Sequence, residues 1–152
     1  MYTYRVHDTP VGPLTSVCSP NGLVRVGFGQ LLADGAVKSD HADVDKQLAQ
    51  FFSGQRRTFD LPLDWSLTSG AYERMQRALL TIPYGETATY AELAKAAGAP
   101  RAARAAGTAC ARNPLVIVVP CHRVVRAGGA IGQYGGGVEM KKFLLEMEAR
   151  FA

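Results

Sequence analysis

The sequence lacks several features that would assign it to a specialised class of protein. Its longest apolar runs, such as Leu115 to Val119, are far too short to cross a bilayer. The opening MYTYRVHDTP contains none of the basic, apolar and cleavage-site segments that direct export. Internal repeats and low-complexity tracts are also absent. We therefore expect a globular protein of the cytoplasm with no membrane partner.

Cysteine is scarce in this chain. The three cysteines, Cys18, Cys110 and Cys121, form an odd set without paired spacing. This pattern argues against a disulfide framework and is typical of a reducing compartment. It also argues against a zinc site, because an adjacent Cys and His cannot easily share one tetrahedral metal and no second spaced pair exists. We expect no bound metal.

The chain has enough apolar residues for a core, and its charge is unevenly distributed. It has 152 residues, of which 47% are hydrophobic. Residues 1–65 carry 6 basic and 7 acidic side chains, whereas residues 66–152 carry 11 and 6. The positive second half indicates a polyanionic partner, with nucleic acid the leading candidate. An ordinary solvated surface is the alternative.

The first third of the chain has the pattern of a small sheet covered by a helix. Alternating apolar residues predict an antiparallel meander of three strands at Tyr2 to Val6, Leu14 to Cys18 and Leu23 to Phe28. The apolar face of a following helix comprises Val44, Leu48, Phe51 and Phe52. The predicted fold class is α+β, with a small N-terminal α/β domain over residues 1–65 and a mostly helical domain over residues 66–152.

The second part of the chain has helical periodicity. One apolar face comprises Tyr72, Met75, Leu79 and Ile82. Thr89 and Glu92 have the spacing of a capping box that opens a short helix. After the breaker GAP, a second helix is expected from Arg101 to Arg112, and a final helix over residues 138–151. The two short helices indicate a helix-turn-helix, although any helical hairpin would give the same pattern.

The second short helix carries a basic stripe. At 100° per residue, one narrow arc holds Arg101, Arg104, Thr108 and Arg112. Small neighbours such as Ala105 would allow close approach to a phosphate-lined groove, and a solvated helix face is the alternative. Cys110 falls on the opposite side, so we interpret it as a buried structural thiol.

The segment IVVPCHRVV places a thiol beside a histidine. Leu115 to Val119 favours a buried strand that Pro120 would end, which would put Cys121 at a strand terminus. A free cysteine is mostly protonated at neutral pH, so a nucleophilic role requires a base or a positive charge. His122 and Arg123 could supply these. A buried, unreactive thiol is the alternative.

Glu148 is the candidate partner for His122. The other glutamates of the final helix have cations three or four residues away, but the helical neighbours of Glu148 are Leu144, Leu145, Phe151 and Ala152. A partly buried carboxylate without a local cation requires a partner elsewhere in the fold. An exposed glutamate near the chain end is the alternative.

Five segments resemble the 6-O-alkylguanine-DNA alkyltransferases, the methylated-DNA-protein-cysteine methyltransferases. In family order they are IPYGETATYAELA, RAARAAGTACARNP, VPCHRVV, GGAIGQYGGG and KKFLLEMEA, all within residues 68–150. The first 65 residues match only loosely. The resemblance implies a helix-turn-helix or winged-helix-like DNA-binding motif. It also implies DNA repair by stoichiometric transfer of the alkyl group of 6-O-alkylguanine to Cys121, with 4-O-alkylthymine as a second candidate lesion.

The resemblance also implies roles for single residues. The catalytic set would be Cys121 as acceptor, His122 as a base acting through water, Glu148 as its orienting partner, Asn113 as a brace and Tyr90 as proton donor to guanine. Arg104 would fill the gap left by a flipped nucleotide, beside Ala105 and Gly107 on the recognition helix. Arg101, Thr108 and Arg112 of the basic stripe complete the predicted DNA-binding set. The base pocket would be lined by Val124, Val125, Tyr134 and Gly135.

Double-stranded DNA carrying alkylated guanine is the expected partner of an expected monomer. Displacement at carbon requires a thiolate and a stabilised leaving group, so no cofactor is expected. Gly135 replaces a serine of some relatives, and Gln76 stands where an aromatic residue is common, which leaves the preferred alkyl group open. Two other classes remain possible by sequence: a non-reactive lesion-binding module and a redox-sensing DNA-binding regulator.

Overall fold

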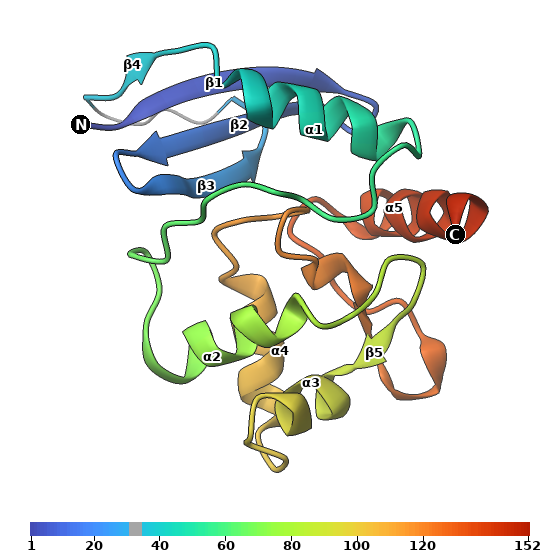
Figure 1. Ribbon diagram of the computed structural model, residues 1–152. Helices are drawn as coiled ribbons and strands as arrows, with labels where there is room; N and C mark the ends of the chain where they lie inside the picture. Colours follow the sequence, from blue (N-terminus) through green and yellow to red (C-terminus); the bar gives the residue numbers. More distant parts are fainter. Residues whose placement is uncertain (31–34) are drawn as a thin grey trace. The chain divides into compact units, whose positions relative to one another are not determined.

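The chain folds into two compact units (Figure 1). The structure is a computed structural model that describes residues 1–30 and 35–152, so part of the loop expected after the third strand lies outside it. The first unit comprises residues 1–67 and 114–118, and the second comprises residues 68–113 and 119–152. The predicted α+β class is confirmed. From the sequence, all of residues 66–152 are expected in the second domain. In the structure, residues 114–118 belong to the first unit.

The first unit is a four-stranded sheet with one helix. The strands are β1 (Thr3–Thr9), β2 (Gly12–Ser19), β3 (Gly22–Phe28) and β4 (Val37–Lys38), in the order β3-β2-β1-β4. The predicted antiparallel meander is β1 to β3, whereas β4 pairs parallel with β1 and is too short to show an alternating pattern. Helix α1 (Ala42–Phe52) buries Val44, Leu48 and Phe51.

The second unit is mostly helical. Its elements are α2 (Gly70–Leu79), β5 (Ala88–Thr89), α3 (Tyr90–Ala96), α4 (Ala103–Ala111), the 3-10 turn η1 (Cys121–Arg123), β6 (Val124–Val125), the 3-10 turn η2 (Ala127–Gly129) and α5 (Val138–Phe151). The predicted capping box is confirmed, because the Thr89 hydroxyl accepts from the Glu92 amide and the Glu92 carboxylate accepts from the Thr89 amide. The short strands β5 and β6 pair in parallel, which brings the start of α3 beside the segment that follows η1.

The predicted strand over Leu115 to Val119 is wrong. Only Leu115 forms a bridge, to Val26, and the chain then turns. The Val118 amide donates to the Val116 carbonyl at 2.8 Å around Ile117, whose φ of 71° is rare for a β-branched residue. A continuous apolar run satisfies burial in any backbone conformation, so its composition does not establish extended structure.

None of the helices in the described ranges, 1–30 and 35–152, is both long enough and apolar enough to span a bilayer.

Candidate active site

Tight turns and one asparagine place the thiol of Cys121. Pro120 adopts φ −83° and ψ 65°, and the Cys121 amide donates to the Val119 carbonyl at 2.9 Å across it. These are the features of an inverse γ-turn. The buried Asn113 side chain donates from Nδ2 to the same Val119 carbonyl at 2.8 Å and also hydrogen-bonds the Cys121 side chain. Asn113 therefore lies where a brace for the turn is needed.

The electrostatics of the pair Cys121 and His122 favour two neutral groups at rest. Burial raises the pKa of the Cys121 thiol, and the Asn113 hydrogen bond and the Lys141 charge oppose this only in part. Burial also lowers the pKa of His122, although Glu148 acts in the opposite direction. A neutral imidazole can accept a proton, so the pair can form a thiolate when a substrate requires it.

Glu148 is fully buried and joins His122 to Arg123. Its Oε2 lies 2.7 Å from His122 Nε2. Arg123 binds it through two nitrogens, with Nε to Oε1 at 2.9 Å and Nη2 to Oε2 at 3.0 Å. The Gly85 amide also donates to Oε1, at 3.2 Å. Burial would raise the pKa of Glu148, but hydrogen bonds from His122 and Arg123 and their charges lower it to about 2. The carboxylate can therefore fix the ring and stabilise an imidazolium.

Arg123 does not act on the thiol in the way its position in the sequence suggests. Its guanidinium points to Glu148 and to the Ile82 carbonyl, 2.8 Å from Nη1. A second cation, which the sequence interpretation missed, serves the site instead. Lys141 is fully buried and donates to the carbonyls of Val124 at 2.6 Å and Gln133 at 3.3 Å. Its spacing from Leu144 and Glu148 on one helical face is the signal that could have revealed it.

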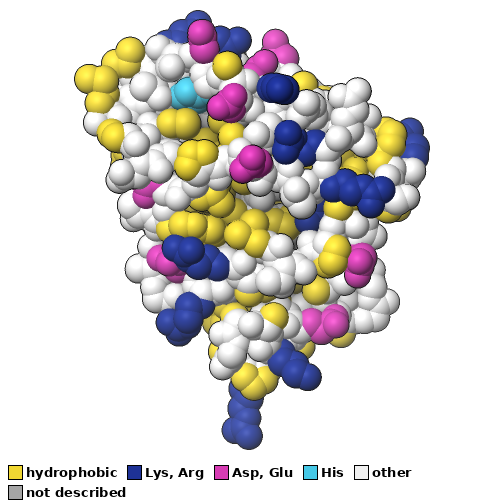
Figure 2. All heavy atoms as spheres, in the orientation of Figure 1, with side chains coloured by type: hydrophobic (Ala, Val, Ile, Leu, Met, Phe, Trp, Pro, Cys, Tyr) yellow, Lys and Arg dark blue, Asp and Glu magenta, His cyan; other side chains and the backbone are white. Residues whose placement is uncertain are grey.

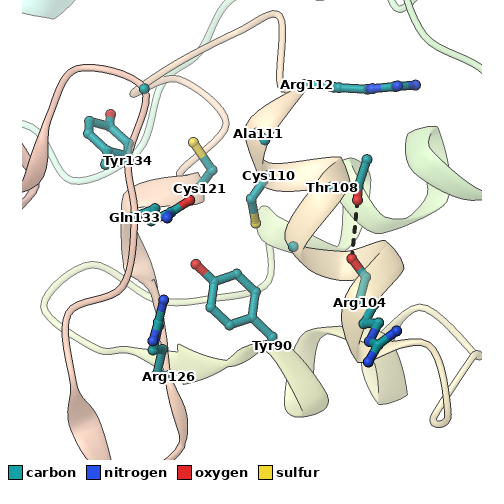
Figure 3. A pocket seen from close by; sticks show the side chains of 12 residues that line it. Tyr90, Arg104, Thr108, Cys110, Ala111, Arg112, Cys121, Arg126, Gln133 and Tyr134 are labelled. Carbon is teal, nitrogen blue, oxygen red and sulfur yellow. Dashed lines mark hydrogen bonds between the residues drawn. The ribbon is translucent and has the colours of Figure 1, made fainter.

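A cavity of about 590 Å³ opens beside the thiol (Figure 3). The predicted site residues that line it are Tyr90, Arg104, Gly107, Thr108, Arg112, Cys121, Tyr134 and Gly135. Four further residues line it that were not predicted for the site: Cys110, Ala111, Arg126 and Gln133. The volume is large enough to admit a nucleobase with an alkyl substituent. Helix α4, Tyr90 and the loop around Tyr134 thus enclose one space that reaches Cys121.

The interpretation of Cys110 as a buried structural thiol is wrong, because the residue is only partly buried. Cys110 lines the cavity, and in Figure 3 its sulfur lies on the side of Tyr90. The cavity extends around the last turn of α4, so residues from both sides of the helical wheel reach it. Burial, with a smaller contribution from Cys121, raises the pKa of Cys110 to about 12. This thiol therefore stays protonated and is a poor nucleophile.

Several predicted residues lie outside the cavity lining. Val124 and Val125 are buried in β6, where they pair with β5 and do not face the cavity. Gln76 also lies outside the lining. Its fully buried side chain donates to the Ala109 carbonyl at 3.1 Å and so connects α2 to α4. His122, Glu148 and Asn113 are also outside the lining, where Asn113 hydrogen-bonds the Cys121 side chain and Glu148 holds the His122 ring.

Helix α4 presents exposed arginines next to the cavity. Ala106 and Ala109 are buried on its inner face, while Arg104 and Arg112 are exposed. The helix runs from Ala103 to Ala111, so Arg101 precedes it and Arg112 is its C-cap residue. Arg112 lies over the Tyr72 ring, 5.2 Å from its centroid. Arg104 forms no ion pair with any acidic side chain in the described ranges.

On the face of the molecule shown in Figure 2, charge alone does not mark a surface for nucleic acid. Figure 2 shows Lys and Arg side chains dispersed among acidic ones on the face in view. The exposed Arg104 and Arg112, which line the cavity, are the residues best placed to contact nucleic acid. Within residues 1–30 and 35–152, no group of three or more His, Cys, Asp or Glu side chains is arranged to hold a metal ion.

Both units match known family models. Residues 2–65 match the ribonuclease-like domain of 6-O-methylguanine DNA methyltransferase, and residues 71–150 match its DNA-binding domain. The chain is 42% identical to a methylated-DNA--protein-cysteine methyltransferase of Mycobacterium tuberculosis, over 97% of this chain and 93% of that protein. It is 38% identical to the Methanosarcina acetivorans protein of the same name, over 95% and 97%.

The fold matches a solved structure of Mycobacterium tuberculosis OGT in complex with DNA. The TM-score is 0.92 with 40% identity, and the match covers 99% of this chain and 94% of that one. The Pyrococcus kodakaraensis O6-methylguanine-DNA methyltransferase is more distant, with a TM-score of 0.69 and 26% identity over 97% of this chain and 99% of that one.

Proposed function

The chain belongs to the 6-O-methylguanine DNA methyltransferase family, which repairs DNA by alkyl transfer to a cysteine, and we propose that the accepting atom in this protein is the sulfur of Cys121. The lesion is 6-O-alkylguanine in duplex DNA, with 4-O-alkylthymine as a second substrate. The protein acts as a monomer. The observation that carries the proposal is the position of Cys121 at a cavity that is large enough for a nucleobase and that Tyr90 also lines.

The reaction begins with formation of the thiolate. The Cys121 thiol gives its proton to His122 through a bound water, and Glu148, 2.7 Å from the imidazole, stabilises the imidazolium. The sulfur then attacks the alkyl carbon in line with the departing oxygen. A carbon-sulfur bond forms as the carbon-oxygen bond breaks, and the electron pair stays with the guanine.

The guanine leaves as a neutral base because Tyr90 supplies a proton. The phenol donates to a ring nitrogen as negative charge develops there, and the phenolate is reprotonated by the proton first held on His122. The product thioether is not readily hydrolysed, so each protein molecule reacts once.

The alkylated nucleotide must leave the helix to reach Cys121. Extrusion costs a few kcal/mol, which stacking, pocket hydrogen bonds and phosphate contacts offset. Helix α4 carries the residues for this step, and Arg104 occupies the gap left in the base stack. The cavity of about 590 Å³ receives the base.

Stoichiometry tests the proposal. With excess duplex containing 6-O-methylguanine, restored guanine should rise until it equals the amount of protein and then stop. A non-reactive lesion-binding module would restore none. Continuing turnover would contradict irreversible capture by the protein's own thiol.

Arg104→Ala should change the rate of transfer from duplex DNA but not the rate from a free alkylated base. We expect transfer from duplex DNA to slow by about tenfold or more, because the extruded state loses its support. Transfer from free 6-O-benzylguanine should be nearly unchanged, since no helix has to be opened. Single-turnover rates on both substrates provide the measurement.

The matched control for Arg104 is Arg74→Ala, which removes an exposed arginine of α2 outside the cavity. This variant should react normally with both substrates. Equal slowing of Arg104→Ala on duplex and free base would contradict the assignment of Arg104 to the base stack.

A further inference from the structure

Arg126 lines the cavity and has no role in the reaction as derived above. It follows β6 directly and precedes the turn η2. Its backbone is fixed by two hydrogen bonds, from its own amide to the Ala130 carbonyl at 2.8 Å and from the Gly129 amide to its carbonyl at 3.0 Å. The side chain is exposed and forms no ion pair with an acidic side chain in the described parts of the chain. A positive charge is thus held at the cavity wall without a carboxylate partner.

Arg126 and the Tyr90 hydroxyl converge on one point, at Gly132. A Cβ placed on Gly132 would lie 3.2 Å from the Tyr90 hydroxyl oxygen and 3.5 Å from both Arg126 Cγ and Lys141 Nζ. Gly132 also has a φ of +78°, which favours glycine, and the close contacts leave little room for a side chain there. Figure 3 shows the guanidinium of Arg126 extending toward the Tyr90 hydroxyl.

Two cations, Arg126 and Lys141, lie near the Tyr90 hydroxyl. Arg126 is the one that can interact with a negative charge formed on the phenol. Lys141 already donates to the carbonyls of Val124 and Gln133. Burial and the neighbouring thiols of Cys110 and Cys121 raise the pKa of Tyr90, and Arg126 is the group that lowers it. Burial makes a phenol a weaker acid, and a nearby guanidinium compensates by stabilising the phenolate.

We propose that Arg126 is a positioning residue for proton donation by Tyr90: its guanidinium stabilises the phenolate that forms as the guanine departs. The inference rests on the proposed function of Tyr90. In this step the O–H bond of Tyr90 breaks, an N–H bond forms on the guanine, and the negative charge moves from the base to the phenolate oxygen beside Arg126. The proton held on His122 later restores the phenol. Contact with a DNA phosphate is the competing role for an exposed arginine.

Free 6-O-benzylguanine distinguishes these roles because it has no phosphate. We expect Arg126→Gln to slow benzyl transfer from the free base by about tenfold. This is less than general acid catalysis usually contributes as a whole, because Tyr90 itself remains. Arg126→Lys should recover most of the rate, because it keeps the charge. The control Arg74→Gln removes an exposed arginine outside the cavity and should react like the unmodified protein.

The variant Tyr90→Phe supplies the second readout. In a Tyr90→Phe background, Arg126→Gln should cause no further slowing, because the phenolate that it stabilises no longer forms. If Arg126→Gln slows transfer only from duplex DNA, the proposal is overturned in favour of phosphate contact. If Arg126→Gln slows benzyl transfer equally with and without the Tyr90 hydroxyl, the proposal is also overturned, because Arg126 then does not act through Tyr90. Failure of the unmodified protein to take up a methyl group from duplex DNA containing 6-O-methylguanine would instead overturn the proposed function.

Discussion

Cys121→Ser is expected to reduce alkyl transfer by roughly three orders of magnitude or more, because it removes the nucleophile. A hydroxyl is a far weaker acid than a thiol, and His122 is not basic enough to ionise it. Serine has nearly the same shape and can keep the hydrogen bond with Asn113. Affinity for duplex DNA carrying 6-O-methylguanine should therefore be nearly unchanged. Single-turnover transfer and equilibrium binding of the same duplex measure the two effects.

The matched control is Cys18→Ser, which makes the same substitution in β2 of the first unit. This variant should transfer at the normal rate. Substantial transfer by Cys121→Ser would contradict the assignment, and an adduct on Cys110 would show that the second thiol of the cavity is the acceptor. The pKa of about 12 for Cys110 is the physical reason to expect no such adduct.

Glu148→Gln is expected to cause the largest loss of stability of any single change in the site. The substitution leaves the Arg123 guanidinium buried without its carboxylate and weakens the hold on His122. Removal of one partner from a buried ion pair typically costs about 3 to 5 kcal/mol of unfolding free energy. Denaturant unfolding gives the value. The control Glu146→Gln, an exposed position on the same helix, should change stability by less than about 0.5 kcal/mol.

The pH dependence of stability should identify the Glu148 carboxylate as the cause. Its pKa is about 2 in the folded protein against an ordinary 4.5, so protons bind the unfolded chain more tightly. Its contribution, about 3 to 4 kcal/mol at 1.4 kcal/mol per pKa unit, is therefore complete above about pH 4.5 and is lost as the pH falls toward 2. The difference in unfolding free energy between unmodified protein and Glu148→Gln should shrink over this range. A constant difference would contradict the ion-pair account.

The parts of the site that depend on local sequence could be predicted. The capping box of Thr89 and Glu92 requires only residues three apart, and it is present. Glu148 could be singled out because its own helix offers it no cation, and the structure supplies His122. The absence of a local partner was informative because a buried carboxylate must find one elsewhere.

The parts that depend on distant segments could not be predicted. Arg123 meets Glu148 from 25 residues away, and Lys141 meets the Val124 carbonyl from 17 residues away. No periodicity within one element specifies such pairs. The helical wheel could not show that the cavity would extend to Cys110 as well as to the arginines. Arg126 was missed because it lies in a turn, where no repeating pattern exists.

The most direct test of the central claim is to locate the transferred group. The protein would be incubated with a duplex oligonucleotide containing 6-O-methylguanine, digested, and sequenced by tandem mass spectrometry. We expect a single added methyl group on Cys121 and guanine restored in the DNA. Repaired DNA with Cys121 unmodified, or a methyl group found on another residue, would contradict it.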